Sequence, residues 1–274
     1  MFASNPFATL TEVISPAMMQ GYIVLMVLFV MGGTILDMLH KKSAKYFFEN
    51  AKKAQKSAKR KVSGGEKAVI AASVLANEVL TAGEFSNPRR RLSHLLMMYG
   101  FILFVVTTAI MIFSPGTTST LLPKLWHIGA IMLAVGAYWF WLCIRVDVSA
   151  EGLPVFRVER ADLFILSLIA TSTFALIWSY SGGGIGISFA LFILSSTVLF
   201  GGVYWSKFAH MFFKPAAAHQ KKITEADGSR ENLPPDYDLT SAEVHSKFPD
   251  VPMYMGKNPP NMGLCIKAER PNHY

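Results

Sequence analysis

The chain has 274 residues, of which 52% are hydrophobic and only 16% are charged. Soluble globular domains carry roughly 25% charged residues, so this composition argues against a soluble enzyme and indicates a membrane protein. The formal net charge is +8, but the basic residues flank apolar segments. Orientation in a membrane and contact with lipid therefore explain the charge better than binding to nucleic acid.

We expect an all-α integral membrane bundle of five transmembrane helices, because five apolar stretches approach the ~20 residues that a bilayer crossing requires. They are Gly21–Leu39, Leu92–Phe113, Leu125–Ile144, Leu163–Tyr180 and Ile185–Trp205. The first twenty residues contain no Lys or Arg, and no small-residue cleavage site follows the first stretch. We therefore expect this stretch to be retained as a span rather than removed as a secretory signal.

The distribution of basic residues predicts the orientation. The insertion 41–91, between the first two spans, carries thirteen Lys or Arg against four Glu. No Lys or Arg precedes the first span, and Lys124 is the only one between the second and third spans. The positive-inside rule then places the N-terminus outside, and the insertion and the C-terminal tail in the cytoplasm.

The insertion itself is predicted to be helical. Residues 41–61 are rich in Lys and Ala and indicate a basic amphipathic helix, with Ala44, Phe47, Phe48, Ala51 and Ala54 at helical spacing. Such a helix lies on anionic lipid or is held against a partner protein, and both interpretations stay open. Ser63 and Glu66 have the spacing of a capping box, which predicts a second helix over 65–81. The pair Asn87-Pro88 then interrupts the chain before the second span.

We divide the chain into a membrane domain, residues 1–214, and a tail, residues 215–274. The tail, from Pro215 to Pro271, contains eight of the fourteen prolines and has no sustained periodicity, so alone it cannot offset its ordering entropy. We interpret it as an extended strap that orders on a soluble partner, with a disordered tail as the alternative. The candidate docking residues are Tyr237, Phe248, Met253, Tyr254, Met255 and Met262.

Three histidines, His40, His94 and His210, each lie at the end of a different apolar segment, beside Lys or Arg. Imidazole is the usual axial ligand of b-type haem, and facing helices commonly supply paired ligands. If the second and fifth spans are neighbours, His94 and His210 can hold one haem near the cytoplasmic edge. Its propionates would pair with Arg89, Arg90, Arg91 and Lys207. The competing interpretation is that these are interfacial histidines without a ligand.

Asp37 is the one clear carboxylate within a span, one turn before His40. An intramembrane carboxylate is a functional candidate, so we assign Asp37 and His40 as quinone-site candidates, with His40 also an alternate haem ligand. Snorkelling of Asp37 toward the cytoplasm is the alternative. We expect His127, at the outer end of the third span, to have a structural role or to donate a hydrogen bond to quinone. The glycines Gly32-Gly33, Gly182–Gly184 and Gly201-Gly202 predict close helix packing.

Two phrases near the predicted cytoplasmic edge carry a resemblance to known proteins. Residues 87–101, NPRRRLSHLLMMYGF, and 207–215, KFAHMFFKP, resemble the membrane subunits of the nitrate reductase gamma-like cytochrome b group. That group includes the membrane parts of the Qmo complex and of heterodisulfide reductases. The tail phrase 248–265, FPDVPMYMGKNPPNMGLC, is similar to the membrane anchor associated with adenylylsulfate reductase in sulfur-oxidising bacteria. The resemblance covers most of the chain.

The resemblance implies a location in the bacterial inner membrane and a partner, the soluble flavin and iron–sulfur adenylylsulfate reductase, on the cytoplasmic face. That enzyme makes adenylylsulfate from sulfite and AMP, and its electrons would pass through this subunit to quinone. The chain departs from the cytochrome b group in one respect. Those subunits usually carry two haems, but the deeper ligand positions here are apolar, as at Phe104 and Phe192. At most one haem is therefore expected.

The leading hypothesis is thus a membrane anchor and electron-transfer subunit with one b haem, without catalytic residues of its own. The alternative is a haem-free scaffold that localises the reductase, with quinone reacting beside the partner's iron–sulfur cluster. A small-solute transporter is disfavoured, because no ionisable residues run through the middle of the other spans.

Overall fold

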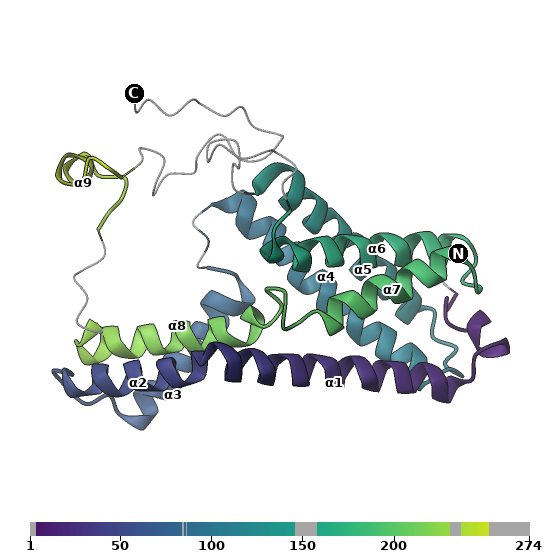
Figure 1. Cartoon of the computed structure of the whole chain (residues 1–274), viewed down its shortest axis with the longest axis horizontal. Coiled ribbons are helices and arrows are strands. Elements are labelled where there is room, and N and C mark those ends of the chain that lie inside the picture. The colour runs from purple at the N-terminus through teal and green to yellow at the C-terminus, as the bar shows by residue number, and fades with distance from the viewer. Residues whose placement is uncertain (1–3, 84, 86, 146–157, 231–236, 252–274) are drawn as a thin grey trace. The chain divides into compact units, whose positions relative to one another are not determined.

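The computed structural model describes residues 4–83, 85, 87–145, 158–230 and 237–251, and every regular element within them is a helix (Figure 1). The chain divides into two units. The bundle unit comprises Met1–Asp37, Leu92–Ile144 and Phe156–Ala209. The basic unit comprises Met38–Arg91, Arg145–Val155 and His210–Tyr274. Each unit is described separately below.

Among the residues that the structure describes, four helices are long and apolar enough to cross a membrane. They are α1 (Pro16–Lys41), α4 (Pro88–Phe113), α5 (Leu121–Trp139), which continues as the π-helical turn η3 (Phe140–Ile144), and α6 (Leu163–Tyr180). They coincide with the first four predicted spans, which confirms the all-helical class and the membrane character of the chain. A short 3-10 helix, η1 (Thr9–Glu12), precedes α1, and another, η4 (Arg160–Asp162), precedes α6.

The fifth apolar helix, α7 (Ile187–Gly201), has 15 residues and is shorter than predicted. At 1.5 Å per residue it is ~22 Å long, less than the ~30 Å hydrocarbon core of a bilayer. The helix ends where the N–H of Gly202 bonds the Val198 carbonyl at 2.8 Å. Turns then continue to residue 209. A fifth crossing therefore stays a prediction.

Small residues bring α4 and α5 into close contact. A Cβ on Gly100 would lie 2.6 Å from the Leu133 backbone nitrogen, and one on Gly129 would lie 2.7 Å from that of Phe104. Further along the same pair of helices, the Ser93 hydroxyl donates to the Gly136 carbonyl at 2.9 Å. Such seams of small residues let membrane helices approach closely.

Aromatic side chains fill the bundle at the end where α5 begins. Trp126 and Trp178 are fully buried, and the Trp178 ring stacks on Phe192 with centroids 5.5 Å apart. Phe7, from the segment before α1, packs against both tryptophans. Both indole N–H groups also have acceptors, the Thr108 hydroxyl and the Gly184 carbonyl, so neither is buried without a hydrogen bond.

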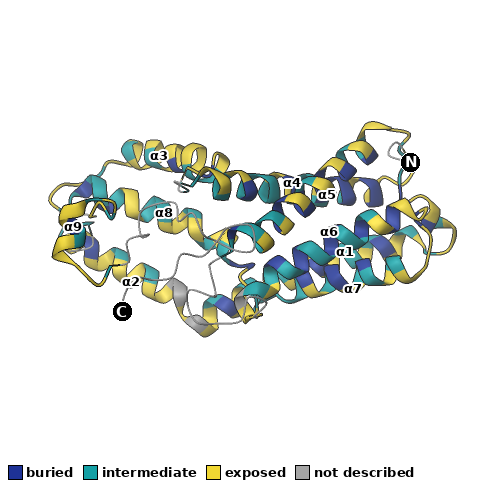
Figure 2. Ribbon diagram, turned by 90° about the horizontal axis from the view of Figure 1, so that it is seen from above, coloured by how far each residue is buried: buried dark blue, intermediate teal, exposed yellow. Residues whose placement is uncertain are grey.

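In Figure 2 buried positions mark α5 and α6, whereas exposed positions dominate α2.

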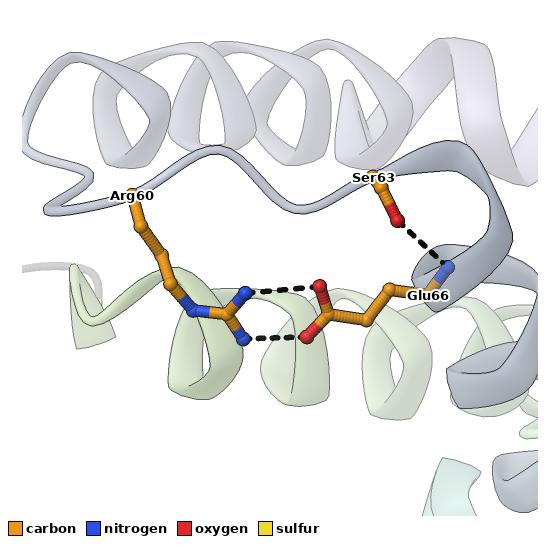
Figure 3. Close-up of polar contacts among 3 residues, drawn as sticks. All are labelled: Arg60, Ser63 and Glu66. Atoms are coloured by element: carbon orange, nitrogen blue, oxygen red, sulfur yellow. Dashed lines mark hydrogen bonds and ion pairs between the residues drawn. The ribbon is translucent and has the colours of Figure 1, made fainter.

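The basic unit contains α2 (Ser43–Lys56), α3 (Gly64–Ser73), the π-helical turn η2 (Val74–Leu80), α8 (His210–Asp227) and α9 (Ala242–Lys247). Ser63 caps α3 as the capping-box spacing predicts, its hydroxyl accepting from the Glu66 N–H at 3.2 Å (Figure 3). The Glu66 carboxylate instead forms a bidentate pair with Arg60, one bond of which is 2.9 Å. This guanidinium holds the pKa of Glu66 below its usual range.

Helix α8 packs against α2, α3 and η2 within the basic unit. Its last carbonyl, that of Asp227, accepts from the backbone N–H groups of Lys59 and Arg60, at 2.9 and 3.3 Å. The expectation of an extended tail from residue 215 is therefore wrong for 215–227, which are helical although Pro215 lies inside the helix. The physical reason is tertiary: the insertion 41–91 supplies the contacts that this helix cannot make alone.

Candidate functional site

Helix α4 carries the first predicted haem ligand and the basic triplet. The Asn87 side chain accepts from the N–H groups of Arg89 and Arg90, at 2.9 and 3.3 Å, and caps the helix, which begins at Pro88, four residues before the predicted span. His94 follows within the first two turns and is half-buried, as is Arg90. The Arg91 guanidinium donates to the Thr81 carbonyl at 2.7 Å. The α4 terminus thus presents an imidazole and guanidinium groups within two turns of one helix.

His210 does not end the fifth apolar helix, contrary to the sequence prediction. Helix α7 stops at Gly201, turns occupy the following residues, and His210 is the first residue of α8. The reason is the Gly201-Gly202 pair, which interrupts the helix instead of serving only as a packing surface. His94 belongs to the bundle unit and His210 to the basic unit, so their pairing stays a prediction.

The irregular segment 202–209 belongs to the bundle unit, and Val203, Phe208 and Ala209 in it are buried. Val203 is fully buried against Gly33 of α1, where an added Cβ would lie 2.8 Å from the Val203 Cβ. This contact confirms the predicted close packing at Gly33. Phe208, 3% exposed, packs against Phe101 of α4 and Phe164 of α6, with ring centroids 6.2 and 5.4 Å apart. Lys207, beside it, is exposed.

Asp37 lies on the face of α1 that packs into the bundle. The buried and half-buried positions of that helix include residues 19, 23, 26, 30, 33 and 37, which recur at a spacing of three and four. Asp37 is only 4% exposed, which favours an interior carboxylate over one that snorkels into water. Helical side chains lean toward the preceding turn, which here carries Gly33. His40, one turn later, is exposed.

His127 has a structural role, one of the two that the sequence left open. Its Nδ1 lies 2.6 Å from the Pro123 carbonyl, and its Nε2 lies 2.7 Å from the Ser179 hydroxyl. A carbonyl can only accept, so Nδ1 carries the proton, and in the neutral ring Nε2 accepts from Ser179. With both ring nitrogens occupied and the residue 4% exposed, His127 ties α5 to α6.

The tail residues are only partly described. Tyr237 and Phe248 flank α9, and their rings contact each other with centroids 5.3 Å apart, while both remain largely exposed. Asp238 beside them accepts from the N–H and hydroxyl of Thr240, which lowers the pKa of its carboxyl. The other docking candidates, Met253, Tyr254, Met255 and Met262, lie outside the described residues.

Two features of the site were missed by sequence reasoning. One is the turn segment 202–209, which the Gly201-Gly202 pair signals. The other is the seam of Gly100, Gly129 and Gly136, which the seven-residue spacing of the last two signals.

Comparison of the chain with protein-family models, with curated proteins and with solved structures found no match.

Proposed function

We propose that the chain is a membrane anchor and electron-transfer subunit that connects a cytoplasmic adenylylsulfate reductase to quinone through one b haem. Three observations support this. Four apolar helices suit a membrane subunit, the basic termini of α4 and α8 carry the two histidines, and the phrases quoted above resemble those of such subunits. The reductase belongs to the proposal through that resemblance alone.

The observation that carries the haem proposal is the packing of Phe208 on Phe101. His94 and Phe101 are seven residues apart on α4 and share a face, ~10 Å apart along the axis. His210 follows Phe208 by two residues, so covalent geometry limits its Cα to ~7 Å from that of Phe208. Phe208, two residues before His210, therefore packs against the face of α4 that also bears His94.

The donor set fits a b haem. His94 and His210 are both half-buried imidazoles, and Arg90 is a half-buried cation on the same helix as His94. In this proposal the histidines bind the iron, and Arg89, Arg90, Arg91 and Lys207 pair with the propionates. The haem would supply one-electron transfer, so this chain would need no flavin or nucleotide site.

Asp37 and His40 are proposed to deliver protons to a bound quinone. Reduction of a quinone takes up protons, and an interior carboxylate beside an exposed imidazole one turn away provides a route from water. The burial of Asp37 on the bundle face supports this assignment over simple snorkelling.

The proposed topology has five crossings, with the N-terminus outside and the tail in the cytoplasm of a bacterium. The 15 residues of α7 would cross together with segment 202–209, in which Val203, Phe208 and Ala209 are buried, because irregular backbone is tolerated at membrane depth where protein covers it. Labelling of single cysteines placed at Ser188 and at Ser246 should show opposite membrane sides. Accessibility from the same side would contradict a fifth crossing.

The decisive experiment is a reduced-minus-oxidised visible spectrum of the purified protein, with haem quantified per chain. We expect a b-type band at about one haem per chain, lost in His94→Leu and in His210→Leu. His219→Leu is the matched control, because His219 lies on α8 and has only a 3.4 Å contact to the Lys67 carbonyl. A flat spectrum from a folded preparation would refute the haem and favour the scaffold, for which the packed basic unit is the docking body.

A further inference from the structure

Helix α2 presents a basic stripe that no other part of the basic unit covers in the residues described. Lys45, Lys52 and Lys56 are exposed and follow one another at seven and four residues, so they share one face, on which Lys45 pairs with Glu49 at 3.8 Å. Tyr46 and Phe48 flank this stripe and are 57% and 62% exposed. Two aromatic side chains thus stand in solvent beside a face that carries three lysines and one glutamate.

The opposite face of α2 is the one that packs. Ala54 is 1% exposed, and Phe47 and Ala51 are half-buried. This face includes three of the five positions that the sequence places at helical spacing, while Phe48 lies outside it. Because α2 contacts α8, its packing need is met without the aromatic pair. The exposure of Tyr46 and Phe48 therefore requires another explanation.

Chain continuity places the start of α2 at the membrane boundary. Leu36 and Leu39, 57% and 70% exposed, are the last apolar surface residues of the α1 span. Lys42 follows in a left-handed conformation, with φ 52°, and separates α1 from α2 by a single residue. From Lys42 to Phe48 an α-helix rises only ~9 Å, so the aromatic pair lies within reach of the lipid headgroups.

We propose that α2 lies along an anionic lipid surface, with Lys45, Lys52 and Lys56 at the phosphates and Tyr46 and Phe48 among the headgroups. Lysines beside aromatic side chains are the usual composition of interfacial helices. The helix contains four Lys and one Glu, which matches the negative charge of such a surface. A protein partner on this face is the alternative that the test separates. The proposal does not depend on the proposed electron-transfer function.

The test reconstitutes the whole protein in vesicles of phosphatidylglycerol and phosphatidylcholine and places a photo-crosslinking p-benzoylphenylalanine on α2. Phe48 and Gln55 are exposed and seven residues apart on one face, so they probe the two ends of the helix. We expect lipid adducts at both positions and none at Ala51, on the packed face. An adduct at position 48 alone means that α2 leaves the membrane, and adducts at neither mean that the face serves a protein; both results overturn the proposal.

A second measurement tests the role of charge. Each lysine at an anionic surface favours binding about fivefold, so Lys52→Gln with Lys56→Gln should lower the lipid adduct at position 55 by up to ~25-fold. Vesicles of phosphatidylcholine alone should lower it similarly. The matched control is Lys221→Gln with Lys222→Gln, two exposed lysines on α8, which should leave the adduct unchanged. Equal yields in both double variants, with helix content retained, would contradict the proposal.

Discussion

Replacement of Gly100 by alanine tests whether the α4–α5 seam holds the bundle together. The added Cβ would lie 2.6 Å from the Leu133 nitrogen and 2.9 Å from the Gly129 carbonyl oxygen. Both are backbone atoms, so no side chain can move aside, and the two helices must separate. Overpacking of this kind costs up to ~3 kcal/mol, whereas Ala in place of a helical Gly contributes ~1 kcal/mol. The expected net loss is ~2 kcal/mol.

The assay is thermal unfolding in mild detergent, where a loss of ~2 kcal/mol lowers Tm by ~4–8 °C for a chain of this size. Gly32→Ala is the matched control, because Gly32 also lies in an apolar helix but an added Cβ meets no atom within 4 Å. It should leave Tm unchanged or raise it through helix propensity. If the two substitutions shift Tm in the same direction and by the same amount, the seam does not hold the helices.

Three further predictions concern single contacts. The lowered pKa of Glu66 means that its pair with Arg60 stabilises the basic unit above the unfolded pKa of the carboxyl, about 4.3, and that this stability is lost as the pH falls below it. Hydrogen exchange of the backbone around Arg60 should therefore become faster below that pH, and Glu66→Gln should abolish this pH dependence. Ser179→Ala leaves a buried His127 nitrogen without a donor and should cost about 1–3 kcal/mol in thermal unfolding; an unchanged Tm would refute the buried bond. Tyr22→Phe removes the hydroxyl that bonds Ser196 and Thr197 of α7, both at 3.0 Å, and should lower the free energy of unfolding by ~1 kcal/mol in the same assay. An unchanged Tm would mean that water replaces the Tyr22 hydroxyl.

The spans and caps could be predicted from sequence because their signals are local. An apolar run predicts a membrane helix without reference to its neighbours, and the first four spans follow that rule. The same holds for the Ser63 cap. The Glu66 half of the capping box failed because a nearby guanidinium, Arg60, outcompetes a backbone N–H for a carboxylate. Helix α8 was missed because its stability comes from the insertion 41–91, which is distant in sequence.

The candidate site shows the same division. The sequence identifies which side chains have ligand chemistry, and Asp37 proves to lie on the inward face of α1. It does not identify the path of the chain between α7 and α8, because a diglycine is compatible with close packing or with a helix end. The structure shows the helix end: α7 stops at Gly201, where an added Cβ would be in ordinary contact with the Phe29 ring at 3.6 Å.

The two ends of the bundle unit differ in a way that bears on function. At the end where α5 begins, helices are regular, both tryptophan N–H groups are satisfied and His127 has partners on both nitrogens. At the opposite end α5 terminates in the π-helical turn η3, and α7 is followed by the turn segment 202–209. Interrupted helices cost backbone hydrogen bonds and are frequent at functional sites. That the same end holds Asp37 and the start of α4 is the physical reason to seek the chemistry of this protein there.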